Sequence, residues 1–142
     1  MVKRCHWPGL DNDPIAQDYH DHEWGKLNLD ESYLYEMMLL ESFQSGLSWA
    51  TILHKRDHFR QAFANFDVDK VAAFSDKDRD RLLHDAGIVR NRLKINAAIN
   101  NAQVIQQMHR DGQTLAGLLK KFVPQVIVNH PTDATKNPAK TA

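Results

Sequence analysis

The spacing of apolar residues in the second half of the chain is the strongest constraint on its fold. Between residues 90 and 110, apolar side chains recur three and four positions apart, as they do on one face of an α-helix. An Asp-Gly pair at 111–112 marks the end of this segment. The pattern predicts a long helix with one side against a core, carried by Leu93, Ile95, Ala98, Ile99, Ala102, Ile105 and Met108.

The other apolar segments each follow a residue that commonly caps a helix. Asp, Ser and Thr side chains accept hydrogen bonds from the free N–H groups of a first helical turn. Such caps at Asp13, Asp30, Ser48, Asp67, Ser75 and Thr114 predict helices over 14–21, 31–45, a segment beginning at Trp49, 68–74, 76–85 and 115–122. Apart from QVIVN at 125–129, no alternating strand pattern occurs. We therefore expect an all-α fold.

The length and composition predict one helical domain followed by a tail. At 142 residues the chain has the length of a single domain, which we expect to cover residues 1–123. Between 124 and 142, prolines lie among Asn, Thr and Lys residues, so we expect an irregular or disordered tail. The sequence has no apolar run long enough to span a membrane and no secretory leader pattern. A single cysteine, Cys5, excludes an internal disulfide, and we expect a cytoplasmic protein.

The net charge is zero, but the charges are segregated along the chain. Residues 1–54 carry three Lys and Arg against nine Asp and Glu, whereas residues 86–142 carry eight against two. A basic half can bind a polyanion such as nucleic acid. Two oppositely charged surfaces can also simply attract each other, so charge alone leaves both interpretations open.

Glu41 is the residue that fits its surroundings least well. It falls within a helical pattern on the same side as Leu34, Met37 and Met38, the side expected to face the core. A carboxylate there has to be paired, neutralised or engaged with a ligand. Four aromatic residues flank predicted turns and helix ends nearby: Trp7, Tyr19, Trp24 and Trp49. Aromatic rings around a carboxylate suit a planar, electron-poor ligand. The alternative is a satellite core in which Glu41 pairs with a lysine or arginine.

Cysteine and histidine residues offer two weaker hypotheses about metal binding. Cys5 and His20 could meet if the first helix folds back, with His6 or His22 as a further zinc ligand. Four ligands are needed for structural zinc, so isolated surface histidines are the alternative. On a later helix, His54 and His58 lie four apart without an evident third ligand, and surface histidines are again the simpler interpretation.

A basic run follows the Ala86-Gly87 turn. Arg90, Arg92 and Lys94 lie where a helix begins, and a helix start with adjacent cations can hold a phosphate. An ordinary solvated helix face would carry the same residues. The sequence therefore predicts either DNA-backbone contacts or a surface without special function here.

Four blocks of sequence resemble the signature blocks of the DNA-3-methyladenine glycosylase I family. They are RCHW at 4–7, DPIAQDYHDHEWG at 13–25, LLESFQSGLSWATIL at 39–53 and DAGIVRNRLKINAAINNA at 85–102. The resemblance extends over residues 3 to about 123. It implies an all-helical member of the helix-hairpin-helix DNA glycosylase superfamily that hydrolyses the N-glycosidic bond of 3-methyladenine without strand cleavage. The implied partners are alkylated double-stranded DNA and free 3-methyladenine as product, and we expect a monomer, or a dimer if the chain is truncated.

The resemblance also assigns roles to single residues. Glu41 matches the pocket glutamate that contacts the flipped base, and Tyr19 and Trp49 match aromatic pocket residues, with Trp7 and Trp24 nearby. Gly46 and Leu47 match the loop that approaches the space left by the extruded nucleotide. Cys5 and His20 match the first two ligands of a structural zinc.

The family's second pair of zinc ligands and its DNA-gripping hairpin lie near the C-terminus, and this chain stops before both, so that His130 has no partner thiol. We therefore expect either a truncated chain or a shortened homologue. Two alternatives to a glycosylase follow. One is a non-enzymatic module that binds modified bases or nucleotides through the same pocket, and the other is a helical interaction domain with Glu41 and the tryptophans in its core.

Overall fold

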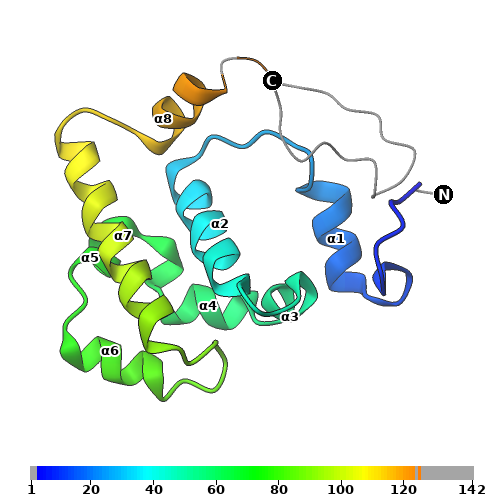
Figure 1. The fold of residues 1–142 in the computed structure, drawn as a ribbon, viewed down its shortest axis with the longest axis horizontal. Coiled ribbons are helices and arrows are strands. Elements are labelled where there is room, and N and C mark those ends of the chain that lie inside the picture. Colours follow the sequence, from blue (N-terminus) through cyan, green and yellow to red (C-terminus); the bar gives the residue numbers. More distant parts are fainter. Residues whose placement is uncertain (1–2, 124, 126–142) are drawn as a thin grey trace.

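The computed structural model describes residues 3–123 and 125, which fold into helices joined by turns and longer loops (Figure 1). The elements in chain order are η1 (Leu10–Asn12), α1 (Pro14–His22), α2 (Glu31–Gln44), α3 (Trp49–His54), α4 (Arg56–Ala62), η2 (Ala64–Phe66), α5 (Val68–Ala72), α6 (Asp76–Leu83), α7 (Arg92–Arg110) and α8 (Leu115–Phe122), where η marks a 3₁₀-helix. No strand occurs among the described residues. The predicted all-α fold is confirmed, and the predicted tail lies outside the described residues except for Gln125.

The predicted cap residues begin the helices as expected. The Asp13 carboxylate accepts hydrogen bonds from two backbone N–H groups of α1, and Asp30, Ser48, Asp67 and Thr114 each accept one from the helix that follows. Ser75 forms a reciprocal capping box with Asp78. Several boundaries differ from the sequence patterns. Helix α7 starts at Arg92 after an Asn91 cap, and α5 and α6 end at Ala72 and Leu83, two residues before the predicted ends. The apolar pattern from Trp49 to Phe66 is divided among α3, α4 and η2.

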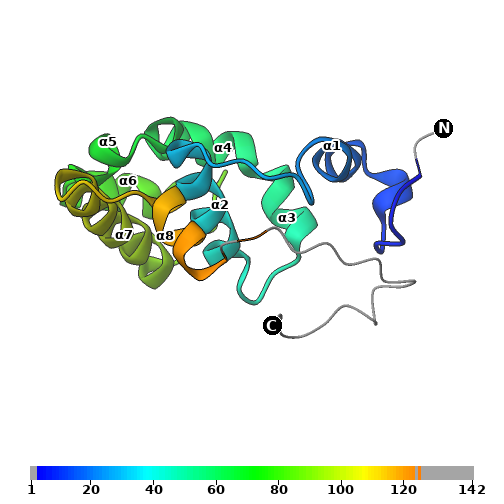
Figure 2. The same cartoon turned by 90° about the horizontal axis from the view of Figure 1, so that it is seen from above.

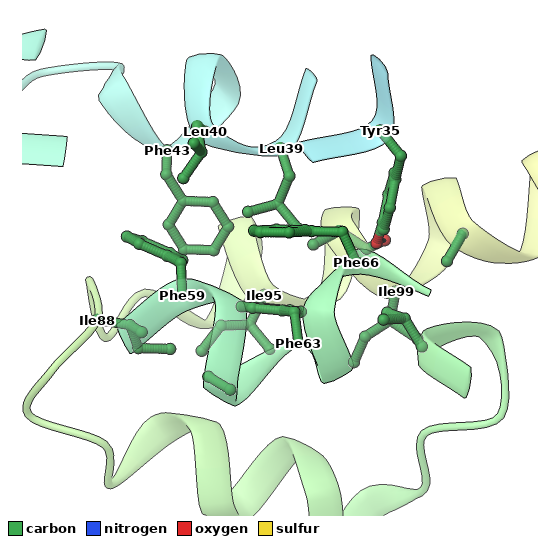
Figure 3. Close-up of a cluster of buried hydrophobic side chains, with 14 of the residues drawn as sticks. Tyr35, Leu39, Leu40, Phe43, Phe59, Phe63, Phe66, Ile88, Ile95 and Ile99 are labelled. Carbon is green, nitrogen blue, oxygen red and sulfur yellow. Dashed lines mark hydrogen bonds between the residues drawn. The ribbon is translucent and has the colours of Figure 1, made fainter. Parts of the chain in front are cut away.

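The main core lies between α2 and α7, with α4, η2, α5 and α6 packed around them (Figure 3). Phe43, Phe59 and Phe63 are fully buried and stack or meet edge to face with ring centroids 5.0–6.2 Å apart. The Tyr35 hydroxyl donates a hydrogen bond of 2.8 Å to the Ala98 carbonyl, which joins α2 to α7. Fully burying each such side chain contributes about 1.5–3 kcal/mol.

The N-terminal segment and α1 lie at one end of the molecule, beside α3 (Figures 1 and 2). They attach through a second buried cluster formed by Leu10, Ala16, Tyr19 and Leu53, with Trp7, Met37 and Trp49 packed against it. This attachment brings residues 3–24 next to α3 and the C-terminal end of α2. No helix in the described part of the chain is long and apolar enough to cross a lipid bilayer.

Candidate functional site

A pocket of about 480 Å³ lies where the N-terminal segment and α1 face the end of α2 and the start of α3. This volume falls within the range of about 300–1,000 Å³ that is usual for small-molecule sites. Its walls contain all five residues that the sequence predicts for a ligand pocket, which are Glu41, Trp7, Tyr19, Trp24 and Trp49. Asp13, Gln44 and Ser48 are among the other lining residues. The structure therefore brings together residues that lie up to 42 positions apart in the sequence.

Glu41 faces this pocket and not the core, so the expectation of a core-facing carboxylate was wrong. Its side chain is exposed, whereas the buried side of α2 consists of Tyr35, Glu36, Leu39, Leu40 and Phe43. One residue turns a helix by about 100°, which places Glu41 beside that face and not within it. An exposed carboxylate at a pocket wall can accept hydrogen bonds from a ligand.

The carboxylate that is buried on α2 is Glu36, which the sequence analysis did not single out. Its Oε1 accepts hydrogen bonds from Arg56 Nε at 2.6 Å and Arg60 Nε at 3.0 Å. Arg56 Nη1 also contacts both carboxylate oxygens of Glu23 at 2.8 and 3.0 Å. Glu23 follows α1 and precedes Trp24, so the buried Arg56 joins the end of α1 to α2 and α4. Burial by itself would lower the pKa of Arg56, but the hydrogen bonds that Arg56 donates to Glu36 and Glu23, together with their negative charges, outweigh burial and raise it.

The aromatic walls hold one another in fixed orientations. The Trp7 and Trp24 rings meet edge to face, with centroids 5.2 Å apart. His20 stacks on Trp24 at 5.6 Å and meets Trp7 edge to face at 5.0 Å. The Tyr19 ring lies 6.4 Å from that of Trp7 and meets Trp49 edge to face at 5.4 Å. A planar ligand between these walls would be offered both ring faces and ring edges.

Tyr19 is a neutral hydrogen-bonding group at this site. Burial raises the pKa of its hydroxyl, and the negative charges of Glu41 and Glu23 raise it further. Arg56 and a hydrogen bond with Trp49 act in the opposite direction but are weaker. The phenol therefore keeps its proton at neutral pH, next to the Glu41 carboxylate.

Asp13 is the second carboxylate in the pocket wall, and its oxygens are already engaged. One oxygen accepts the N–H groups of Ile15 and Ala16, and the other contacts His54 Nε2 at 2.8 Å. Hydrogen bonding to His54 is the main cause that lowers the pKa of Asp13. The sequence identified Asp13 only as a helix cap, which the structure confirms. His54 thus contacts the residue that caps α1. His58, which lies four positions after His54 and was considered with it as a metal ligand, packs against Gly87.

Cys5 and His20 do meet, as the sequence analysis considered, but through the backbone of Cys5. The Cys5 N–H donates to His20 Nε2 at 3.2 Å, and His20 Nδ1 contacts Asp21 Oδ1 at 3.0 Å. Both ring nitrogens of His20 are thus engaged within the protein. In the described ranges 3–123 and 125, no three His, Cys, Asp or Glu side chains come together as metal ligands. The described donors do not by themselves fit a four-ligand zinc site, and His130 lies outside them.

The residues predicted to contact DNA divide into two groups. Gly46 and Leu47 form the exposed turn between α2 and α3, at the edge of the pocket. Arg90 and Arg92 are exposed at the start of α7. The ammonium group of Lys94 instead contacts two backbone carbonyls at the end of α2. The interpretation of Lys94 as a phosphate contact therefore does not match its surroundings.

Comparisons with known proteins identify relatives that cover the pocket. The chain is 44% identical to DNA-3-methyladenine glycosylase 1 of Escherichia coli (strain K12) over 128 residues, which are 88% of this chain and 67% of that protein. It is 39% identical to DNA-3-methyladenine glycosylase of Haemophilus influenzae (strain ATCC 51907 / DSM 11121 / KW20 / Rd) over 142 residues, 99% of this chain and 76% of that protein.

Solved structures give the same result. A crystal structure of a 3-methyladenine DNA glycosylase I superposes with a TM-score of 0.92 at 39% identity, covering 98% of this chain and 76% of that one. The 3-methyladenine DNA glycosylase I from Staphylococcus aureus, in a structure that describes 3-methyladenine recognition, gives a TM-score of 0.75 at 37% identity over 79% of this chain and 60% of that one. Residues 7–142 match the sequence family described as methyladenine glycosylase. The chain therefore belongs to the methyladenine glycosylase family.

Proposed function

We propose that this protein is a DNA base-excision glycosylase that hydrolyses the N-glycosidic bond of 3-methyladenine in alkylated DNA. The observation that carries the proposal is the pocket itself, where an exposed carboxylate, a neutral phenol and three tryptophans face one cavity. Membership in the methyladenine glycosylase family and the similarity to the 3-methyladenine glycosylases support this assignment. The partners are alkylated double-stranded DNA and the released base.

The pocket suits a base that has left the duplex. An enzyme cannot reach a base inside stacked DNA, so the nucleotide has to be flipped into a cavity and recognised by stacking and edge contacts. Adenine that carries a methyl group on N3 is cationic within DNA, and a cationic ring is attracted to the faces of tryptophan and tyrosine. In this proposal the rings of Trp24, Trp7, Tyr19 and Trp49 surround the base, and the Glu41 carboxylate accepts hydrogen bonds from its edge.

The chemistry requires little of the protein beyond binding and electrostatics. The bond between the sugar and the base breaks, and its electron pair leaves with the base, which becomes neutral 3-methyladenine. A water molecule adds to the sugar carbon and loses a proton to the solvent. In this proposal the negative charge of Glu41 also stabilises the positive charge that develops on the sugar as the bond breaks. The described residues that line the pocket include no lysine, which supports simple hydrolysis over Schiff-base chemistry and strand cleavage.

Glu41→Gln tests this proposal because it keeps the shape of the side chain and removes the charge. We expect the wild type to release 3-methyladenine from methylated duplex DNA and the variant to release it about a hundredfold more slowly. Asp76→Asn, which neutralises a fully exposed carboxylate on α6, is the matched control and should behave as the wild type. Chromatography of the released bases is the measurement. Binding of methylated DNA without release by the wild type would support the alternative of a modified-base binding module instead.

Several expectations remain outside this proposal. Zinc binding through Cys5 and His20 stays a prediction, and no step above uses a metal. The helix-hairpin-helix assignment, the monomeric state and the cytoplasmic location also stay predictions.

A further inference from the structure

Lys94 lies in the first turn of α7, and its side chain is partly buried against the end of α2. Its Nζ donates to the backbone carbonyl oxygen of Phe43 at 2.9 Å and to that of Ser45 at 2.6 Å. Phe43 is a fully buried residue of α2, and Ser45 is the residue that ends this helix. The ammonium group therefore closes the C-terminus of α2 from a helix about 50 residues further along the chain.

This position has a clear electrostatic reason. The last carbonyl groups of a helix have no partner within it, and their dipoles leave partial negative charge at that end. A cation stabilises this end, and a hydrogen bond from a charged donor is stronger than one from a neutral donor. Two of the three ammonium donors of Lys94 are used in this way. The ammonium group of Lys94 is thus accounted for by hydrogen bonds within the protein.

The contact fixes the turn that carries the exposed Leu47. After Ser45, Gly46 adopts a left-handed conformation with φ of +82°, and the Leu47 N–H returns to the Gln44 carbonyl at 2.6 Å. Ser48 then caps α3 through a 3.1 Å bond from the Thr51 N–H. Residues 45–48 are therefore held from both sides, with Leu47 41% exposed at the tip. The same four residues connect the pocket wall of α2 to that of α3.

We propose that Lys94 is a positioning residue for base excision, an inference that rests on the proposed function. By holding the carbonyls of Phe43 and Ser45, it keeps the 45–48 turn in one conformation, so that Leu47 can enter the duplex. Lys94 acts on DNA through this turn and not by neutralising a phosphate.

Lys94→Met removes the ammonium group and keeps an unbranched apolar chain as long as the lysine stem. We expect release of 3-methyladenine from methylated duplex DNA to fall about tenfold to a hundredfold, as for a misplaced reacting group. Release from methylated single-stranded DNA should fall much less, because no base stack has to be opened there. Lys94→Arg, which restores a cation, should recover part of the duplex activity. Lys77→Met, at an exposed lysine of α6, is the control for loss of one positive charge and should behave as the wild type.

Two further readouts separate positioning from phosphate binding. Amide hydrogen exchange of residues 43–49 should become faster in Lys94→Met, since the turn loses its anchor. The salt dependence of duplex binding should keep the wild-type slope, whereas loss of a phosphate contact would reduce the slope by about one. If Lys94→Met does not fold, Lys94→Gln, which keeps a polar but uncharged and shorter side chain, is measured by the same criteria.

The inference is overturned if Lys94→Met excises from duplex DNA as fast as the wild type. It is also overturned if the salt slope falls by about one and both substrates lose activity equally, because Lys94 would then be a phosphate contact. Absence of base release by the wild type on either substrate would instead refute the proposed function, so the two failures are distinguishable.

Discussion

Replacement of Arg56 by Met should destabilise this protein more than any other single change in its charged network. The guanidinium group is almost buried, with 11% of the side chain exposed, and it contacts Glu36 at 2.6 Å and Glu23 at 2.8 Å. Removing one partner of a buried ion pair usually costs about 3–5 kcal/mol, because the remaining charges lose their compensation. Glu36 keeps Arg60 at 3.0 Å and Glu23 keeps the Tyr33 hydroxyl at 3.1 Å, so we expect the lower end, about 3 kcal/mol.

Urea denaturation followed by circular dichroism measures this loss. For a slope near 2 kcal/mol/M, a loss of about 3 kcal/mol lowers the midpoint by about 1.5 M. Arg60→Met is the matched control, because Arg60 contacts the same Glu36 oxygen but 40% of its side chain is exposed. The cost of that change should be no more than about 1 kcal/mol.

A second variant tests the reason for the loss. In Arg56→Met with Glu36→Leu, the buried carboxylate is removed together with its partner, and apolar packing should recover part of the stability. If Arg56→Met and Arg60→Met unfold at the same urea concentration, burial of the Arg56 pair does not determine its contribution to stability. A double variant that is less stable than Arg56→Met alone would also show that the unpaired buried carboxylate is not the cause of the loss.

Two further predictions concern the N-terminal segment and the loop before α7. The pKa of Asp21 is lowered to about 2, mainly by its hydrogen bond with Arg4 and to a lesser extent by that with His20. A carboxylate with a lowered pKa in the folded state contributes stability above about pH 4, and this contribution is lost as the pH falls toward 2. Tryptophan fluorescence should therefore report loosening around Trp7 in that window, and a titration of Asp21→Asn with the same change would contradict this cause. Gly87→Ala should cost about 1–3 kcal/mol, because the added Cβ would lie 2.7 Å from Cγ of His58. Gly112→Ala meets no atom within 4 Å but has φ of +76°, so its thermal unfolding measures backbone strain without a clash. A Gly87→Ala variant that unfolds at the wild-type temperature would show that His58 moves to relieve the clash.

The pocket residues could be identified from the sequence because of the four blocks that resemble the glycosylase family. The predicted burial of Glu41 did not help, because it was wrong. The apolar pattern around Glu41 suggested a core position, whereas the structure exposes that residue at a pocket wall. The side of α2 that faces inward is selected by packing against α4 and α7, and Glu36 is tolerated there because Arg56 and Arg60 reach it. Nothing in the local sequence distinguishes the two glutamates, because the partners of Glu36 lie 20 or more positions away.

The sequence by itself determined the elements of the fold, since the interactions that define them are local. Helical periodicity and a cap such as Ser48 or Thr114 involve residues three or four positions apart, and the helices begin where those caps predicted. Tertiary structure alone decided the role of Lys94 and the convergence of the aromatic walls. Contacts between Lys94 and the end of α2 join residues 49 and 51 positions apart, and they exist only because α7 packs against α2 in the folded core.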